Sequence, residues 1–214
     1  MFIDLQTRLQ RAGNSTLTTR RALGLGAWLF AFAILLAGCA HKPSFDEQTL
    51  AIKQSPHKTL AIYTVNVTPA SYWLRETRRQ YTKREVDTLI ERYQTLLSNT
   101  FNDEMVDAGW QLDANSPLKA TLEINHFRVS APDIKGALTD LYAQDELGSA
   151  TFTLSLFEGE ALVAKFVDRR DVPTMVPGKL EPTNRVTNQR GFKRELEQFL
   201  RDCNGVLKPV FQLP

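Results

Sequence analysis

The chain has 214 residues, of which 43% are hydrophobic and 23% charged, as is typical of a globular protein with one or two domains. Its formal net charge is +2. Residues 1–38 carry four arginines and one aspartate, so removing them from the 26 basic and 24 acidic residues leaves 22 and 23, a net charge of −1. A nearly neutral body lacks the basic excess of nucleic-acid-binding proteins, so we expect no nucleic-acid partner.

Residues 1–38 have the three parts of a bacterial export signal. A polar segment ends in Arg20 and Arg21, and an uncharged apolar run of 16 residues follows from Ala22 to Ala37. Such a run is shorter than the roughly 20 residues that a helix needs to cross a bilayer. We therefore expect a cleaved signal peptide. Residues 19–23 also resemble a twin-arginine signal, which leaves both export routes open.

The signal ends in the motif Leu36-Ala37-Gly38-Cys39, which matches the lipobox of bacterial lipoproteins. Small residues at 37 and 38 let the signal peptidase approach the backbone, and the Cys39 thiol accepts diacylglycerol. Several acyl chains together secure stable anchoring. The next residue is Ala40, whereas an aspartate there retains lipoproteins at the inner membrane. These features predict a lipid-anchored protein on the periplasmic face of the outer membrane.

Residues 39–57 are polar, contain two prolines and lack periodicity, so we expect a flexible lipidated tether before a domain at 58–214. A β-branched and aromatic run at 58–67 predicts a strand. The capping-box pattern of Thr82 and Glu85 predicts the start of a helix. Apolar residues at helical spacing continue to Met105, and Gly109 ends the helix.

Alternating apolar residues predict further strands at 118–129, 150–156 and 161–167, the last two joined in a hairpin. We expect a loop at 133–147, with a short element at Leu138–Tyr142, and a proline-rich loop at 171–188. A last helix places Phe192 to Cys203 on one face, and Asn204-Gly205 is expected to end it. The predicted order is β-α-β-β-β-α. It indicates an α+β two-layer sandwich with an antiparallel or mixed sheet of about four strands covered on one side by two helices.

The sequence contains no motif typical of a catalytic or metal site. The histidines at 41, 57 and 126 lack metal-ligand spacing, and neither a nucleophile elbow nor a nucleotide-binding fingerprint is present. We expect no catalytic residue, no metal and no cofactor, and therefore not an enzyme. With Cys39 lipidated, Cys203 has no partner for an internal disulfide, and we expect it to be buried.

The most unusual stretch, residues 71–84, interleaves bases with aromatic residues. Its candidate binding residues are Tyr72, Trp73, Arg75, Arg78, Arg79, Tyr81, Lys83 and Arg84. One interpretation is a surface for anionic headgroups or an acidic partner, with Arg169-Arg170 facing the same edge. The other, which we favour from sequence alone, is a solvated loop whose aromatic rings pack on the sheet.

Three further segments carry a resemblance to a known family. They are Val129-Ser-Ala-Pro-Asp, Gly148-Ser-Ala-Thr-Phe-Thr-Leu-Ser-Leu-Phe-Glu-Gly-Glu and Val163-Ala-Lys-Phe-Val-Asp-Arg-Arg. Together with the lipobox and the long helix, they resemble the bacterial lipoproteins of domain-of-unknown-function family 3313 over about residues 58–205. The proline-rich segment at 171–188 departs from that family. The resemblance implies a lipoprotein and no particular function.

We therefore expect a binding, accessory or scaffold component of the cell envelope, with an envelope protein or an anionic lipid as its partner. A lipid- or small-ligand-binding module is the alternative, and an envelope hydrolase is the least favoured hypothesis.

Overall fold

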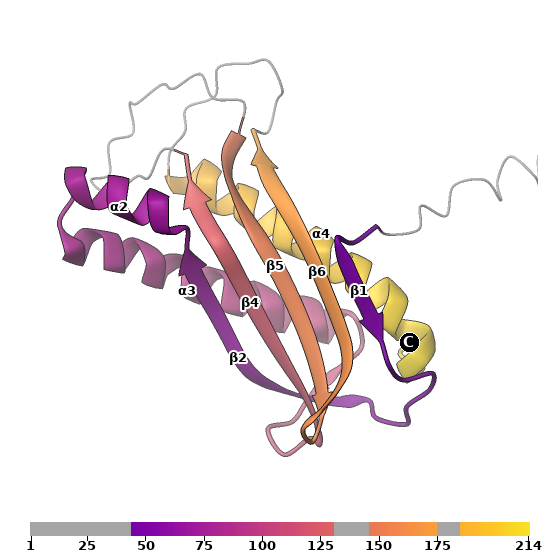
Figure 1. Cartoon of the computed structure of the whole chain (residues 1–214). Helices are drawn as coiled ribbons and strands as arrows, with labels where there is room; N and C mark the ends of the chain where they lie inside the picture. The colour runs from indigo at the N-terminus through magenta and orange to yellow at the C-terminus, as the bar shows by residue number, and fades with distance from the viewer. Residues whose placement is uncertain (1–43, 131–145, 175–184) are drawn as a thin grey trace, which may run out of the picture. The chain divides into compact units, whose positions relative to one another are not determined.

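The computed structural model of the protein describes residues 44–130, 146–174 and 185–214 (Figure 1). These residues form a six-stranded sheet in the order β1-β6-β5-β4-β2-β3. Strand β2 is parallel to β3 and β4, and the other neighbours are antiparallel, so the sheet is mixed. The strands are β1 (Glu47–Leu50), β2 (Thr59–Pro69), β3 (Gln111–Leu112), β4 (Leu118–Val129), β5 (Glu146–Glu158) and β6 (Ala161–Pro173).

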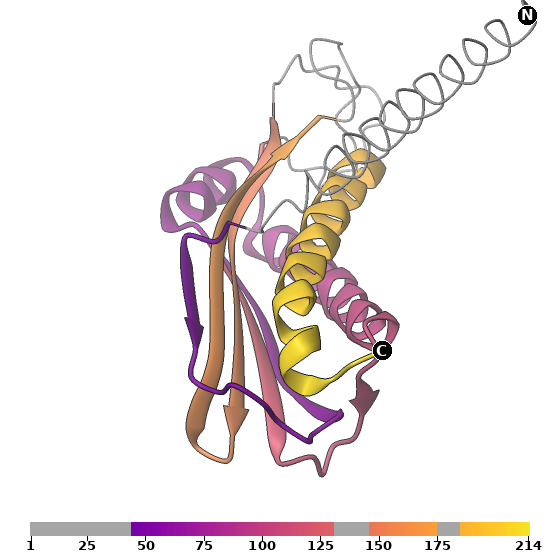
Figure 2. The same ribbon diagram turned by 90° about the vertical axis from the view of Figure 1, so that its right-hand side faces the viewer.

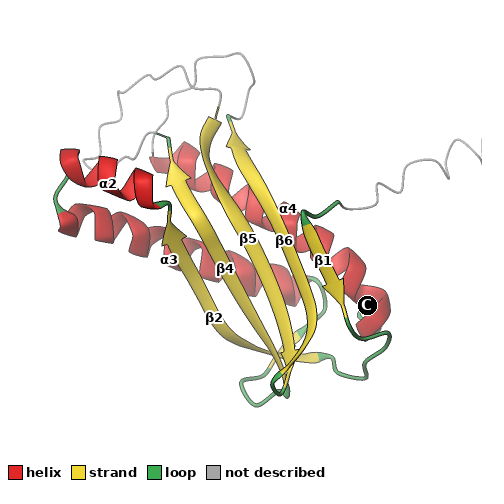
Figure 3. Cartoon of the chain, viewed as in Figure 1, coloured by secondary structure: helices red, strands yellow, loops and turns green. Residues whose placement is uncertain are grey.

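Three helices accompany the sheet in the part of the chain that is described. They are α2 (Ser71–Gln80), α3 (Lys83–Asp107) and α4 (Arg185–Phe211). Helices α3 and α4 lie on one face of the sheet, whereas α2 lies beside the end of β2, next to the start of α3 (Figures 1 and 2). The opposite sheet face carries no helix among these residues, as the colouring by secondary structure makes plain (Figure 3). None of the described helices is long and apolar enough to cross a membrane.

The prediction of about four strands and two helices is wrong, although the class remains α+β. Strand β1 lies within 39–57, the segment interpreted as a tether, and pairs with β6. Helix α2 lies in the stretch interpreted as a solvated loop. Strand β3 has only two residues, too few for any pattern in the sequence to reveal it. The expected short element at Leu138–Tyr142 lies outside the described residues.

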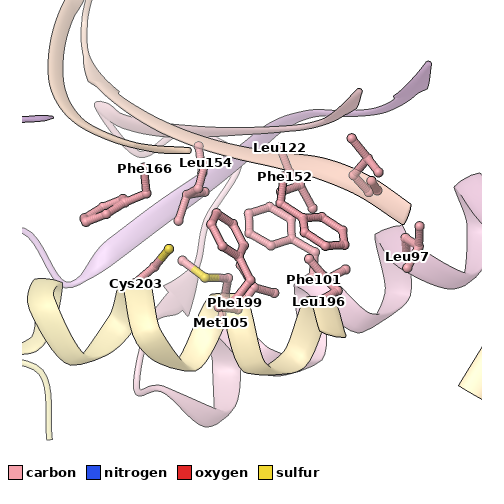
Figure 4. Close-up of a cluster of buried hydrophobic side chains, with 14 of the residues drawn as sticks. Leu97, Phe101, Met105, Leu122, Phe152, Leu154, Phe166, Leu196, Phe199 and Cys203 are labelled. Carbon is pink, nitrogen blue, oxygen red and sulfur yellow. The ribbon is translucent and has the colours of Figure 1, made fainter. Parts of the chain in front are cut away.

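The core lies between the sheet and the pair α3 and α4. Alternate residues of β4 and β5 are buried, and they meet the apolar stripes of the two helices (Figure 4). Phe152 of β5 stacks on Phe199 of α4, with ring centroids 5.6 Å apart, and Phe101 and Met105 of α3 are fully buried in the same cluster. This burial of apolar surface is the main stabilising contribution to the fold.

Helix α4 continues through Asn204-Gly205 to Phe211, so the predicted helix end is wrong. Asn204 is buried, and its Oδ1 accepts a hydrogen bond of 3.1 Å from Nε1 of Trp110. Phe211 packs on the same indole, with centroids 5.0 Å apart. Packing of this last segment against Trp110 therefore outweighs the weak helix propensity of Asn and Gly.

The outer edge of β2 is closed by a side chain of α3. The amide group of Gln94 accepts a hydrogen bond from the backbone N–H of Val67 at 2.8 Å and donates one to the carbonyl oxygen of Val65. Gln94 thus substitutes for a neighbouring strand at an edge whose unpaired backbone groups would otherwise be open to another chain.

Candidate functional site

The lipobox residues Leu36, Ala37 and Gly38 and the lipidation residue Cys39 lie outside the described residues. The first described residue is Ser44. Lipidation therefore remains a prediction. The other candidate site, the basic-aromatic stretch at residues 71–84, lies within the described residues.

Helix α2 begins where β2 ends, because Pro69 closes the strand and Ala70 turns the chain. The backbone N–H of Ala70 donates to the carbonyl oxygen of Phe127 at 2.9 Å, which fixes the start of the helix beside β4. Trp73 and Thr77 share the buried side of α2. Trp73 is the one large apolar residue of α2 that is fully packed, with the partly buried Leu74 beside it, and it anchors the helix.

Trp73 is only 7% exposed and is therefore not part of the exposed face of α2. Its Nε1 donates a hydrogen bond of 2.8 Å to the carbonyl oxygen of Val129, and its ring meets Phe127 edge-on with centroids 6.1 Å apart. Both partners lie at the end of β4, so the indole fastens α2 to the sheet. The expectation that aromatic rings of this stretch pack on the sheet is met by Trp73.

A bulge in β4 shapes the place where Trp73 docks. His126 has a positive φ of 53°, and the pairing of β4 with β5 shifts between Asn125 and Arg128. The extra residue moves the buried positions from even to odd numbers, so that Phe127 and Val129 face the core. Nothing in the sequence signals this bulge.

The exposed residues of the stretch gather on α2 and the first turn of α3. Arg75, Arg78, Arg79, Lys83 and Arg84 are exposed, and we call these five residues the basic surface. Among the described residues Arg78 is the one member that forms an ion pair, at 3.4 Å to Asp87, and both side chains are about 40% exposed (42% and 40%). Tyr72 is 51% exposed, and Tyr81 is half-buried.

The helix dipole favours some charges of the basic surface and disfavours others. Arg78 and Arg79 lie in the last turn of α2, where a helix favours positive charge. Lys83 and Arg84 occupy the first turn of α3, where the helix dipole disfavours positive charge. The predicted capping box is present there, since Thr82 and Glu85 bond reciprocally, but it satisfies backbone groups and leaves both bases exposed.

Arg169 and Arg170 do not join the basic surface. They lie on β6, which β5 and β4 separate from β2. Arg170 is partly buried, with 13% of its side chain exposed, and its guanidinium donates to Asp168 and Asp202, each at 2.7 Å. Burial opposes the charge of Arg170, but these two hydrogen bonds outweigh it and raise its pKa above the ordinary value. Burial also raises the pKa of Asp168, against the influence of Arg170. This cluster joins β6 to α4.

A cleft that the sequence did not predict lies beside α2. Its volume is about 720 Å³, and it is lined by Tyr72, Trp73, Glu76, Arg128, Val129, Ser130, Glu146, Asp171 and Pro173. Arg128 pairs with Glu146 and donates to Ser149 Oγ at 2.8 Å. Burial lowers the pKa of Arg128, but its bond to Glu146 outweighs this and leaves the pKa raised. Three carboxylates against one guanidinium make the lining acidic.

Other chemically reactive groups are dispersed. No group of three His, Cys, Asp or Glu side chains within the described ranges is arranged to hold a metal ion. Cys203 is fully buried, and burial raises the pKa of its thiol well above the ordinary value. His57 contacts Glu158 at 2.9 Å, at the opposite end of the sheet from α2.

Comparisons with known proteins gave matches only among solved structures. No family model matches, so the resemblance to family 3313 is unconfirmed, and no curated protein matches either. Among solved structures, the chain is similar to two structures of the PelC dodecamer from Paraburkholderia phytofirmans. Both have a TM-score of 0.37, at 11% and 12% identity, and the match covers 77% of this chain and 94% and 96% of theirs. A third match, described as a candidate lipoprotein from Caulobacter crescentus, has a TM-score of 0.34 and 18% identity over 54% of this chain and 80% of that chain.

Proposed function

We propose that the protein is a non-enzymatic binding component of the bacterial cell envelope. Cys39 anchors it by lipid to the periplasmic face of the outer membrane, and the basic surface binds an anionic partner. The anchor follows from the lipobox and from Ala40 in the sequence. The observation that carries the binding role is the exposure of five bases on two adjacent helices, in a body with a net charge of −1 once residues 1–38 are removed.

Two further features support binding over catalysis. Nucleophilic cysteine chemistry requires a thiolate, and the Cys203 thiol is buried with a raised pKa, so it is kept protonated. Trp73 and its hydrogen bond to Val129 hold α2 against the sheet, so three arginines are presented on a fixed scaffold. A rigid presentation reduces the entropy that binding must overcome.

The binding role is tested by neutralising the bases of α2. We would replace Arg75, Arg78 and Arg79 with Gln in a form that starts at Ala40, which retains every described core residue. Envelope extract is then passed over the immobilised protein at low and high salt, because contacts between exposed charges weaken as salt screens them. We expect salt-sensitive capture by the original protein and loss of capture by the variant.

A matched control removes three positive charges elsewhere. Lys53, Arg190 and Arg201 are also exposed, and their replacement by Gln gives the same net charge as the α2 variant. The control should retain capture, and circular dichroism should show both variants folded. Equal loss in both variants would mean that total charge, and not the basic surface, determines binding.

The anchor is tested separately. Cys39→Ser should abolish palmitate labelling and leave an unprocessed or soluble protein. Ala40→Asp should shift the protein toward the inner-membrane fraction of a density gradient. A processed Cys39→Ser protein that still partitions with membranes would refute lipidation at this residue.

The acidic cleft favours a second candidate function, a small-ligand-binding module. Exposed Tyr72 stands beside three carboxylates there, an arrangement that suits a cationic group. A thermal-shift screen of amines tests this. Stabilisation that Tyr72→Ala removes and that Tyr63→Ala, at another exposed tyrosine, leaves unchanged would support it.

A further inference from the structure

The start of β1 is fixed to the edge of the sheet. Phe45 packs on Phe166 and Phe199, with centroids 5.0 and 6.2 Å apart. The carboxylate of Asp46 accepts a hydrogen bond of 2.8 Å from the backbone N–H of Arg169. Glu47 then pairs with Lys165 at 2.9 Å. The chain is therefore held from Phe45 onward.

This attachment leaves little free chain after the lipidation residue. Six peptide steps separate Cys39 from Phe45, and at about 3.6 Å per residue they span at most about 22 Å. If the lipid of Cys39 lies in a leaflet, as the proposed function holds, the edge of β6 where Phe45 docks stays within that distance of the membrane surface.

The basic surface lies toward the same end of the sheet as this attachment point. The backbone N–H of Ala70 bonds to the carbonyl oxygen of Phe127, near the C-terminal end of β4. In the register of the sheet, Arg128 of β4 lies opposite Ser149 of β5, and Ser149 lies opposite Asp171 of β6. Asp46 bonds to Arg169, only two residues before Asp171. β1 itself begins at Glu47, opposite Val167 and four residues from the level of Asp171, and Figure 1 shows the starts of β1 and α2 at similar heights.

The distance across the sheet from β1 to the far end of α2 is also compatible with one membrane plane. Four spacings between strands, from β1 to β2, amount to about 19 Å, and the ten residues of α2 add about 15 Å. A single flat leaflet can therefore hold the lipid and touch the basic surface.

The composition of the surface favours lipid headgroups over a folded protein. Hot spots between proteins are Trp, Tyr and Arg side chains held in desolvated pockets, whereas here Trp73 is buried in the fold and the arginines of α2 are exposed. Bases near an anionic leaflet contribute about 1 kcal/mol each without any pocket. The lipid anchor makes this contact intramolecular, which raises its effective concentration. The geometry points to the anionic headgroups of the anchoring leaflet itself as the partner of the basic surface, an inference that rests on the proposed function.

The test uses the full-length, lipid-modified protein in vesicles. A fluorescent dye is attached at Gln80→Cys, beside the basic surface, or at Glu160→Cys, in the hairpin turn at the opposite end of the sheet. Labelling is selective because Cys203 is buried and the Cys39 sulfur is blocked by diacylglycerol. Vesicles contain phosphatidylethanolamine with or without phosphatidylglycerol, plus a lipid that carries a nitroxide quencher on its headgroup.

We expect quenching at position 80 with phosphatidylglycerol and little at position 160. High salt should reverse it. The Arg75, Arg78 and Arg79 to Gln variant should weaken the contact about a hundredfold, since three bases at about 1 kcal/mol each amount to about two factors of ten. The control variant at Lys53, Arg190 and Arg201 should keep the quenching.

The outcomes separate this inference from the proposed function. If the protein does not float with any vesicle, the lipid anchor fails, and the proposed function fails with it. If it floats but position 80 is unquenched, or is quenched equally without phosphatidylglycerol, only the inference is overturned. Capture of an envelope protein by the basic surface, with position 80 unquenched, would identify an acidic protein as the partner instead.

Discussion

Replacement of Trp73 tests whether α2 is held as described. Trp73→Ala removes a buried indole, its hydrogen bond to Val129 and its edge contact with Phe127. Truncation of a buried Trp to Ala costs about 3–5 kcal/mol. Trp73→Phe keeps an aromatic ring but loses the donor and leaves a buried carbonyl oxygen unpaired, which costs about 1–3 kcal/mol.

The assay is urea unfolding followed by circular dichroism. With a slope of about 2 kcal/mol per molar urea, Trp73→Ala lowers the midpoint by about 2 M and Trp73→Phe by about 1 M. The native-state helical signal should also fall in Trp73→Ala, because Thr77 is the only other fully packed residue of α2. Trp73→Phe keeps α2 in place and should therefore keep the binding of the basic surface.

Two results would refute this reasoning. An unchanged midpoint for Trp73→Ala would mean that the indole does not anchor α2. Retained, salt-sensitive binding by Trp73→Ala would mean that the bases act as a flexible charged segment and that their arrangement on a helix is irrelevant.

Three other residues give predictions of different kinds. Gln94→Ala removes both hydrogen bonds to the edge of β2 and should lower the free energy of unfolding in urea by about 1–3 kcal/mol. The variant should also scatter more light when it is concentrated, because the edge is open to another chain, and unchanged scattering would argue against edge protection. Gly205→Ala should stabilise the protein by about 1 kcal/mol, since the position is helical and open; a lower midpoint would show that the chain leaves the helix there. Burial raises the pKa of Glu104, so the folded state binds its proton more tightly and stability falls as pH rises through the folded pKa. Glu104→Gln should therefore increase stability at pH 7 and have little effect at about pH 3, below the ordinary pKa, and the opposite pH trend would contradict the sign.

Most of the sheet and the two long helices were predictable because one face of each is buried. Strand β4 alternates buried and exposed residues over Leu118 to Ile124, and α3 buries one residue per turn from Val86 to Met105. These are the two periods that burial on one face imposes on a sequence. Local chemistry also identified the start of α3, since its capping box is entirely within Thr82 to Glu85.

The elements that were missed owe their structure to distant partners. Strand β1 has the sequence Glu-Gln-Thr-Leu, with every residue exposed, and pairing with β6 and the packing of Phe45 determine its conformation. Helix α2 has one large buried residue in ten, so no apolar period was visible. Such short segments acquire order from tertiary contacts that no local pattern records.

The candidate site was found in part, for a physical reason. A cluster of bases and aromatic residues can be recognised in the sequence alone, but the sequence does not show which of them are buried and which are exposed. Only the bulge at His126 explains why Phe127 and Val129 face inward to receive Trp73, and the same bulge turns Arg128 into the cleft. The cleft is lined by residues of α2, β4, β5 and β6, so no single segment of the sequence could predict it.

The positions of the bases indicate that they do little to stabilise the fold. Lys83 and Arg84 lie in the first turn of α3, where each exposed base costs about 0.3–1 kcal/mol and an acidic residue would be favourable. A sequence optimised only for this helix would carry acids at both positions. Arg75 and Arg79 form no ion pair among the described residues, although Arg79 gains from its place in the last turn of α2. Local rules of helix design are broken mainly where a function requires it. The unfavourable placement of Lys83 and Arg84 agrees with the proposal that the basic surface binds an anionic partner.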